Sequence, residues 1–128
     1  MVSTNRAQRI ADRIREELAE MLIFDIQDPR LAGAYITDVS VDRELAFADI
    51  YVFSSEGSES ADEVLTGFRR AGGFLRSELA KRVDLRTFPK LRFHWDPTPE
   101  RAEKIEELLD TLDLEASPEA EDDLSGNE

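Results

Sequence analysis

The basic side chains of one short segment are the clearest candidates for chemistry in this sequence. Residues 69–92 read RRAGGFLRSELAKRVDLRTFPKLR and hold eight cations against two carboxylates, a local charge of +6 in a chain of −13. Such a concentration in an acidic chain is typical of a surface that meets a polyanion, with a solvated charged face as the alternative. The candidate phosphate contacts are Arg69, Arg70, Arg76, Lys81, Arg82, Arg86, Lys90 and Arg92.

Catalytic chemistry has little support in the residues. The one histidine, His94, precedes Asp96 by two positions, and no Gly-x-Ser-x-Gly, P-loop or Gly-x-Gly-x-x-Gly motif occurs. Without cysteine, thiol nucleophiles and thiolate metal sites are excluded. A small hydrolase that uses His94 is the weaker alternative. The sequence therefore predicts a protein that is not an enzyme and has neither a metal nor a cofactor.

Aromatic side chains offer a second way to hold nucleic acid. Phe47, Tyr51 and Phe53 share one face of a predicted strand. Such a row can stack on bases of single-stranded RNA, but rows of this kind more often pack across neighbouring strands. We favour packing.

Length and composition predict one folded domain and a tail. The 128 residues are enough for a core without disulfides. The charged N-terminus and the absence of an apolar run of about 20 residues predict a cytoplasmic protein with no membrane segment. Residues 113–128 hold seven acids and no cation, which is typical of a disordered segment. We therefore expect a domain over residues 1–112 and an acidic disordered tail over residues 113–128.

Periodicity gives the elements that position the basic segment. A helical stripe runs from Arg6 to Phe24, with Arg6, Arg9 and Arg13 near the end that the helix dipole disfavours for cations. Two strands, residues 34–41 and 46–53, form a hairpin, and a change of parity between Ile36 and Val39 predicts a bulge or an uncertain register there. A helix from about residue 60 to 82, a strand over residues 90–95 and a last helix from Thr98 follow. This order predicts an α+β fold with helices on one face of three strands.

The glycine pair in the middle of the basic helix is the most specific feature of this order. Two adjacent glycines, Gly72 and Gly73, cost about 2 kcal/mol in a helix interior, so a kink or two helices meeting at an angle are expected. An α-β-β-α-α-β order is the type II KH arrangement. A second helix N-terminus beside Arg69, Arg70 and Arg76 would offer free amide donors to phosphate.

Five segments together resemble the bacterial ribosome-binding factor A family. They are residues 9–18 (RIADRIREEL), 28–30 (DPR), 37–52 (TDVSVDRELAFADIYV), 71–79 (AGGFLRSEL) and 86–93 (RTFPKLRF). The resemblance implies a KH-like domain in which an Ala-x-Gly kink, here Ala71 and Gly73, replaces Gly-x-x-Gly. It also implies a non-catalytic factor that binds the small (30S) ribosomal subunit and assists late maturation of 16S rRNA.

These observations together predict an rRNA-binding surface on a monomeric factor. We expect the eight cations of residues 69–92 to contact rRNA phosphates, aided by Arg6, Arg9 and Arg13 if the first helix packs alongside. Ala71 and Gly73 would set the angle of the kink. Ribosomal proteins are further candidate partners. An acidic protein–protein adaptor, with the acidic surface as its binding face, is the alternative function.

Overall fold

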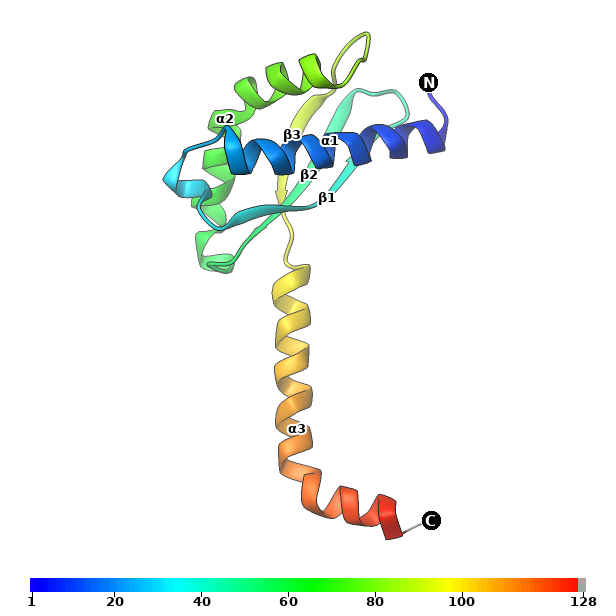
Figure 1. Ribbon diagram of the computed structural model, residues 1–128, viewed down its shortest axis with the longest axis vertical. Helices are drawn as coiled ribbons and strands as arrows, with labels where there is room; N and C mark the ends of the chain where they lie inside the picture. Colours follow the sequence, from blue (N-terminus) through cyan, green and yellow to red (C-terminus); the bar gives the residue numbers. More distant parts are fainter. Residues whose placement is uncertain (127–128) are drawn as a thin grey trace. The chain divides into compact units, whose positions relative to one another are not determined.

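The structure is a computed structural model that describes residues 1–126, and side chains as far as residue 113. The chain divides into two compact units, Met1–Asp96 and a second that begins at Pro97. The elements in chain order are α1 (Thr4–Phe24), η1 (Pro29–Leu31), β1 (Ala34–Val41), β2 (Phe47–Ser54), η2 (Ser58–Ser60), α2 (Ala61–Arg82), β3 (Lys90–Trp95) and α3 (Thr98–Gly126) (Figure 1).

The first unit is built on a three-stranded sheet in the order β1-β2-β3. β1 and β2 are antiparallel, and their register shifts between Ile36 and Asp38, which confirms the predicted bulge. β2 and β3 are parallel, so that Asp49 pairs with Arg92 and Tyr51 with His94. Because β3 is last in the order of the sheet, it is an edge strand. The long connection that a parallel pair requires is supplied by α2.

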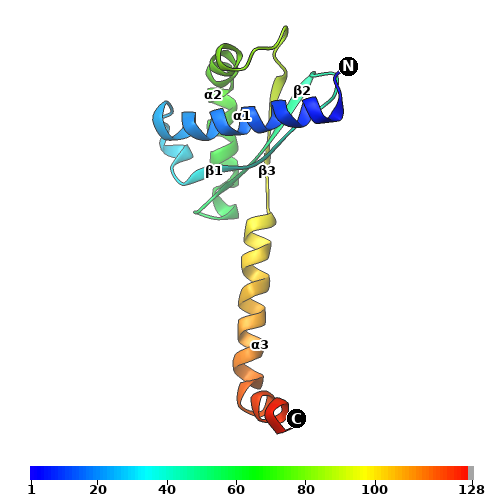
Figure 2. The same ribbon diagram turned by 45° about the vertical axis from the view of Figure 1, so that its right-hand side comes forward.

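Two helices form the second layer of this unit. The buried core contains side chains from α1, from α2 and from all three strands, including Ile14, Leu18, Ile50, Phe68 and Phe93. α1 packs mainly against β1, and α2 packs against β3; both views show α1 crossing the strands (Figures 1 and 2). The predicted two-layer α+β architecture is confirmed.

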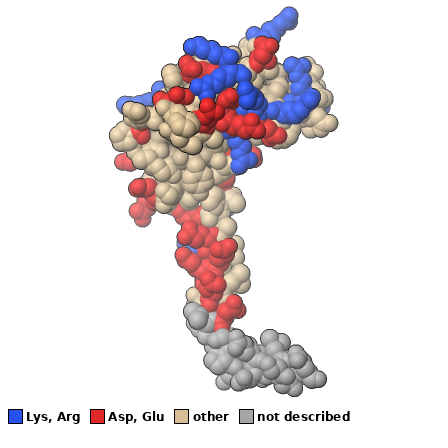
Figure 3. Space-filling model, viewed as in Figure 1, with Lys and Arg blue, Asp and Glu red and all other residues tan. Residues whose placement is uncertain are grey.

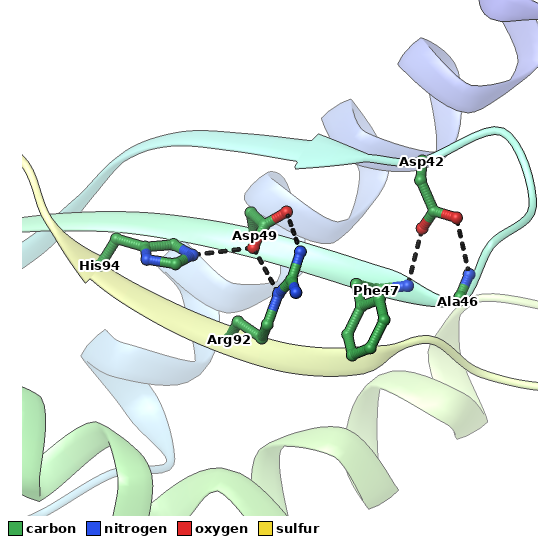
Figure 4. Close-up of polar contacts among 6 residues, drawn as sticks. All are labelled: Asp42, Ala46, Phe47, Asp49, Arg92 and His94. Atoms are coloured by element: carbon green, nitrogen blue, oxygen red, sulfur yellow. Dashed lines mark hydrogen bonds and ion pairs between the residues drawn. The ribbon is translucent and has the colours of Figure 1, made fainter.

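The turn of the hairpin is fixed by one carboxylate. Asp42 accepts hydrogen bonds from the backbone N–H of Phe47 at 2.7 Å and of Ala46 at 3.2 Å (Figure 4). These bonds, the one from Phe47 first, hold the pKa of Asp42 below its ordinary value. Leu45, within the turn, has a φ of 58°, a left-handed conformation that is uncommon for a residue with a side chain. The turn sets the register that carries Phe47 and Asp49 onto one face.

The basic helix α2 is one continuous helix of 22 residues. Of the two expected alternatives, separate helices are therefore wrong, and no second helix N-terminus lies beside Arg69, Arg70 and Arg76. The ribbon of α2 nevertheless changes direction near its middle in both views (Figures 1 and 2). The specific roles of Ala71 and Gly73 in this bend stay a prediction.

A different glycine is the one that packing requires in α2. A Cβ atom on Gly67 would lie 2.9 Å from Cδ2 of Leu31, whereas one on Gly73 would meet nothing within 4 Å. Gly67 thus lets η1 approach α2 closely. Periodicity within α2 could not identify this contact, because Leu31 belongs to another part of the chain.

The second unit contains α3. This helix begins at Thr98, as predicted, and its backbone continues to Gly126, past the expected start of the tail at residue 113. Ile105, Leu108, Leu109 and Leu112 on α3 are all more than half exposed. The core described above lies within Met1–Asp96, so the domain limit at residue 112 stays a prediction. The last two residues of the expected tail lie outside the described residues.

Candidate nucleic-acid interface

A groove of about 600 Å³ lies between α2 and the edge strand β3. Its β3 wall is the run from Lys90 to His94, and its α2 wall is formed by Arg69, Gly72, Gly73 and Arg76. Four of the eight predicted cations therefore line one groove, two on each wall: Arg69, Arg76, Lys90 and Arg92.

The two glycines leave the middle of the α2 wall without side chains. A Cβ atom on Gly72 would reach ordinary contact with the Phe93 ring, at 3.9 Å from Cε2, and one on Gly73 would point into open space. Neither position is one that only glycine can occupy. Their effect is to leave room between Arg69 and Arg76 for a ligand to approach the helix backbone.

The β3 wall adds backbone groups to the groove. The N–H of Lys90 donates to Ala46 O at 2.9 Å, and the N–H of Asp96 donates to Val52 O at 2.8 Å. Even-numbered residues of β3 thus turn their amides toward β2, and the alternation of a strand turns those of Leu91 and Phe93 toward the sheet edge. The groove therefore combines cationic side chains with hydrogen-bonding backbone.

Arg92 is partly neutralised by a carboxylate on β2 (Figure 4). Its Nε donates to Oδ1 of Asp49 at 2.8 Å and its Nη2 donates to Oδ2 at 3.0 Å, while its guanidinium carbon lies 4.0 Å from the centre of the Phe47 ring. His94 Nε2 lies 2.8 Å from the same Oδ1. Hydrogen bonding from Arg92, with a smaller part from His94, holds the pKa of Asp49 below its ordinary value, and Asp49 raises the pKa of Arg92.

Arg76 has its position set by backbone oxygens. Its Nη2 donates to Phe88 O at 2.7 Å and its Nε donates to Pro89 O at 3.2 Å. Neither acceptor carries a charge, so Arg76 keeps its full positive charge while it ties the loop before β3 to α2. Arg69 and Lys90 are exposed, and within the part of the chain that the structure describes neither forms an ion pair with a carboxylate.

Two predicted cations are held in ion pairs outside the groove. Arg82 Nη2 lies 3.0 Å from Asp25 Oδ2 and its Nη1 lies 3.6 Å from Glu17 Oε2, so it joins α2 to α1. Lys81 Nζ lies 3.3 Å from Glu78 Oε1, one turn away on the same helix. Arg82 is half-buried and is better explained as a link between helices.

The remaining predicted cations lie on other surfaces. Arg70 lies on the side of α2 that faces η1. Hydrogen bonds from Arg30 are the main cause of the lowered pKa of Asp28, and the charge of Arg70 makes a smaller contribution. Arg86 is exposed in the loop before β3. Arg6, Arg9 and Arg13 are exposed along α1, where Arg13 pairs with Glu17 at 3.1 Å. On the face shown in Figure 3, basic side chains form several separate groups. The groove therefore gathers only part of the predicted set of cations, and the contacts expected of the others stay a prediction.

The aromatic row of β2 packs across strands, as favoured. Tyr51 stacks on His94 with ring centres 5.1 Å apart, and Phe53 lies 5.2 Å from Trp95. His94 is thus engaged by a ring and by Asp49. Among the described residues, no three His, Cys, Asp or Glu side chains are placed to hold a metal ion. No helix in the described part of the chain is long and apolar enough to span a membrane.

Comparison with known proteins gives consistent matches over most of the chain. A family model described as ribosome-binding factor A matches residues 6–109. The ribosome-binding factor A of Alcanivorax borkumensis is 47% identical over 130 residues, covering 96% of this chain and 91% of that protein. The corresponding protein of Aromatoleum aromaticum is 43% identical over 108 residues, covering 84% of this chain and 85% of that protein.

A crystal structure and a fitted homology model have the same fold. The crystal structure of ribosome-binding factor A from Thermus thermophilus superposes with a TM-score of 0.62 at 26% identity, over 70% of this chain and 93% of that one. A homology model of the Thermus thermophilus factor, fitted into a cryo-EM map of a 30S complex, superposes with a TM-score of 0.59 at 27% identity, over 72% of this chain and 96% of that one.

Proposed function

The chain belongs to the ribosome-binding factor A family, and we propose on that basis that it binds the small (30S) ribosomal subunit. It acts as a non-catalytic, cytoplasmic, monomeric factor that assists late maturation of 16S rRNA. The relative fitted into a map of a 30S complex supports the choice of particle. The groove between α2 and β3 supports the choice of rRNA as the ligand.

The convergence of Arg69, Arg76, Lys90 and Arg92 on one groove carries this proposal. Cations from two elements on opposite walls can neutralise successive phosphates of a strand that runs between them. The outward amides of β3 add donors, and the glycines of α2 let the backbone approach. Arg70, Lys81, Arg86, Arg6, Arg9 and Arg13 then act as peripheral contacts. The assignment of Arg82 is weaker, because its guanidinium already faces two carboxylates.

The protein acts by differential binding. If it holds one rRNA conformation more tightly than its alternatives, it shifts the population toward that conformation without bond chemistry. The bend of α2 aids this role because it sets the angle at which Arg69 and Arg76 face β3. Ala71 and Gly73 are the residues to which we assign the bend.

A salt titration with charge-reversed variants tests the proposal. Neutralising about four phosphates gives a log–log slope of affinity against salt of about −3. R69E/K90E should bind 30S subunits at least about tenfold more weakly, with a slope shallower by about 1.5. R15E/R101E makes the same charge change at two exposed sites outside the groove and serves as the control. Equal losses for the two variants, or a flat salt response of the wild type, would refute the assignment.

The adaptor alternative makes a different prediction. A protein whose acidic surface binds another protein keeps its partner after the rRNA is digested with nuclease. Loss of the protein from nuclease-treated particles supports rRNA as the main ligand, whereas full retention supports the adaptor.

A further inference from the structure

Two large apolar side chains at the end of α1 are largely exposed to solvent. Ile23 is 73% exposed and Phe24 is 72% exposed, although the remaining apolar stripe of this helix, from Ala7 to Met21, is buried. Isolated exposed apolar residues are ordinary, but adjacent large ones beside a groove indicate an interaction site. Neither residue takes part in the basic groove.

A second groove lies next to Ile23. It encloses about 460 Å³ between the end of α1, η1 and the start of β1. Its apolar lining includes Leu22, Ile23, Ile26, Pro29, Leu31 and Ala34. Figure 3 shows an area with few charged side chains over this end of α1. We call Ile23, Phe24 and this groove the α1 patch.

The charges around the α1 patch are negative. Residues 16–35 contain five carboxylates and one cation, Arg30. Arg82 reaches Asp25 from α2 and Arg13 pairs with Glu17 at 3.1 Å, which leaves a net charge of −2. Arg30 is itself paired with Asp28 at 2.7 Å. The uncompensated charge lies on Glu16 and Glu20, and Glu20 is one helical turn before Ile23 and Phe24.

The negative charge around the α1 patch indicates which class of partner can bind there. Phosphates are repelled by Glu16 and Glu20, so RNA is disfavoured at the α1 patch. A second copy of the chain is disfavoured too, because each copy carries a net charge of −13 and the same acidic rim. A cationic polypeptide segment with an apolar side chain matches both features, since its charge faces the rim and its apolar group enters the groove.

We propose that the α1 patch binds a cationic segment of a protein on the small subunit and is a second contact, separate from the basic groove. The inference rests on the proposed function, because it takes the 30S subunit as the particle that carries this segment. It adds a protein ligand to the rRNA ligand. The two contacts lie on different elements, so they can be removed independently.

Paired binding measurements on intact 30S subunits and on protein-free 16S rRNA test this inference. I23S/F24S removes only exposed apolar groups, so it should fold normally, with an unchanged unfolding midpoint. It should bind intact subunits at least about tenfold more weakly, because two anchors are lost, and should bind free rRNA as the wild type does. E16Q/E20Q should weaken binding to intact subunits without weakening binding to rRNA. R69E/K90E should weaken binding to both.

Each other result overturns the inference. Unchanged binding of I23S/F24S to intact subunits shows that the α1 patch has no partner there, and an equal loss on free rRNA shows that it contacts RNA. Wild-type dimers in sedimentation equilibrium that I23S/F24S abolishes would make a second copy the occupant. If the wild-type protein binds neither intact subunits nor free rRNA, the proposed function itself is refuted. The α1 patch is then refuted as a contact with the subunit as well.

Discussion

Replacing Gly67 with alanine tests the tightest contact between α2 and the rest of the first unit. The added Cβ atom would lie 2.9 Å from Cδ2 of Leu31, 3.1 Å from Cγ of Leu31 and 3.3 Å from Cβ of Arg30. Leu31 is buried, and η1 is held by Asp28, whose Oδ1 accepts from the N–H of Arg30 at 3.0 Å. The neighbours of the new methyl group therefore have little room to move.

The expected magnitude follows from two opposing effects. Overpacking of this kind costs about 1–3 kcal/mol, and replacing glycine by alanine within a helix returns about 1 kcal/mol. G67A should thus lose up to about 2 kcal/mol of unfolding free energy. G73A is the matched control, because it makes the same change six residues later, where no atom lies within 4 Å. It should gain about 1 kcal/mol.

Urea unfolding of both variants and the wild type measures this difference. The transition midpoints should separate by an amount equivalent to about 1–3 kcal/mol, with equal slopes. In thermal unfolding, each kcal/mol shifts Tm by about 4–8 °C for a domain of this size. Equal stability of G67A and G73A would refute the packing of η1 against α2 described above.

Four further outcomes are expected. Hydrogen bonds from Phe47 and Ala46 lower the pKa of Asp42 from 3.8, so the stability that ionised Asp42 contributes is present above pH 3.8 and is lost as the pH falls below it. The unfolding free energy of D42N should therefore vary less with pH in this acidic range than that of the wild type. D49N should free Arg92 and raise affinity for rRNA about two- to fivefold, a gain that filter binding would detect and that a lower affinity would contradict. R82Q should lower stability without changing the salt slope of subunit binding, because Arg82 faces Asp25 and Glu17; a shallower slope would return it to the rRNA site. A chain ending at Asp96 should retain cooperative unfolding, since the core lies before that residue, and a broad transition would show that the core needs α3.

Local pattern was sufficient for most of the architecture. The strand predicted over residues 46–53 is β2, and its alternate residues Ala48, Ile50 and Val52 are all buried. The helical stripe predicted from Arg6 to Phe24 likewise forms α1, whose apolar residues from Ala7 to Met21 supply its buried face. These predictions succeed because the periods of helix and strand are properties of the backbone itself. The parity change after Ile36 predicted the bulge for the same reason.

The composition of the site was determined by the sequence only in part. Charge counting located residues 69–92, but it could not separate Arg69, which faces β3, from Arg70, which acts on Asp28. Adjacent residues on a helix point about 100° apart, so a cluster in sequence becomes two clusters in space. Only the packing of α2 decides which side is the groove.

Contacts between distant segments were decided by the tertiary structure alone. Asp49 meets Arg92 because β2 and β3 run parallel in a register that the sequence of neither strand specifies. Gly67 is needed because Leu31 approaches it, and Arg82 is engaged because Asp25 ends α1 beside it. The sequence determined which residues are charged, apolar or small. Their partners were decided by packing, since each of these contacts joins residues that lie far apart along the chain.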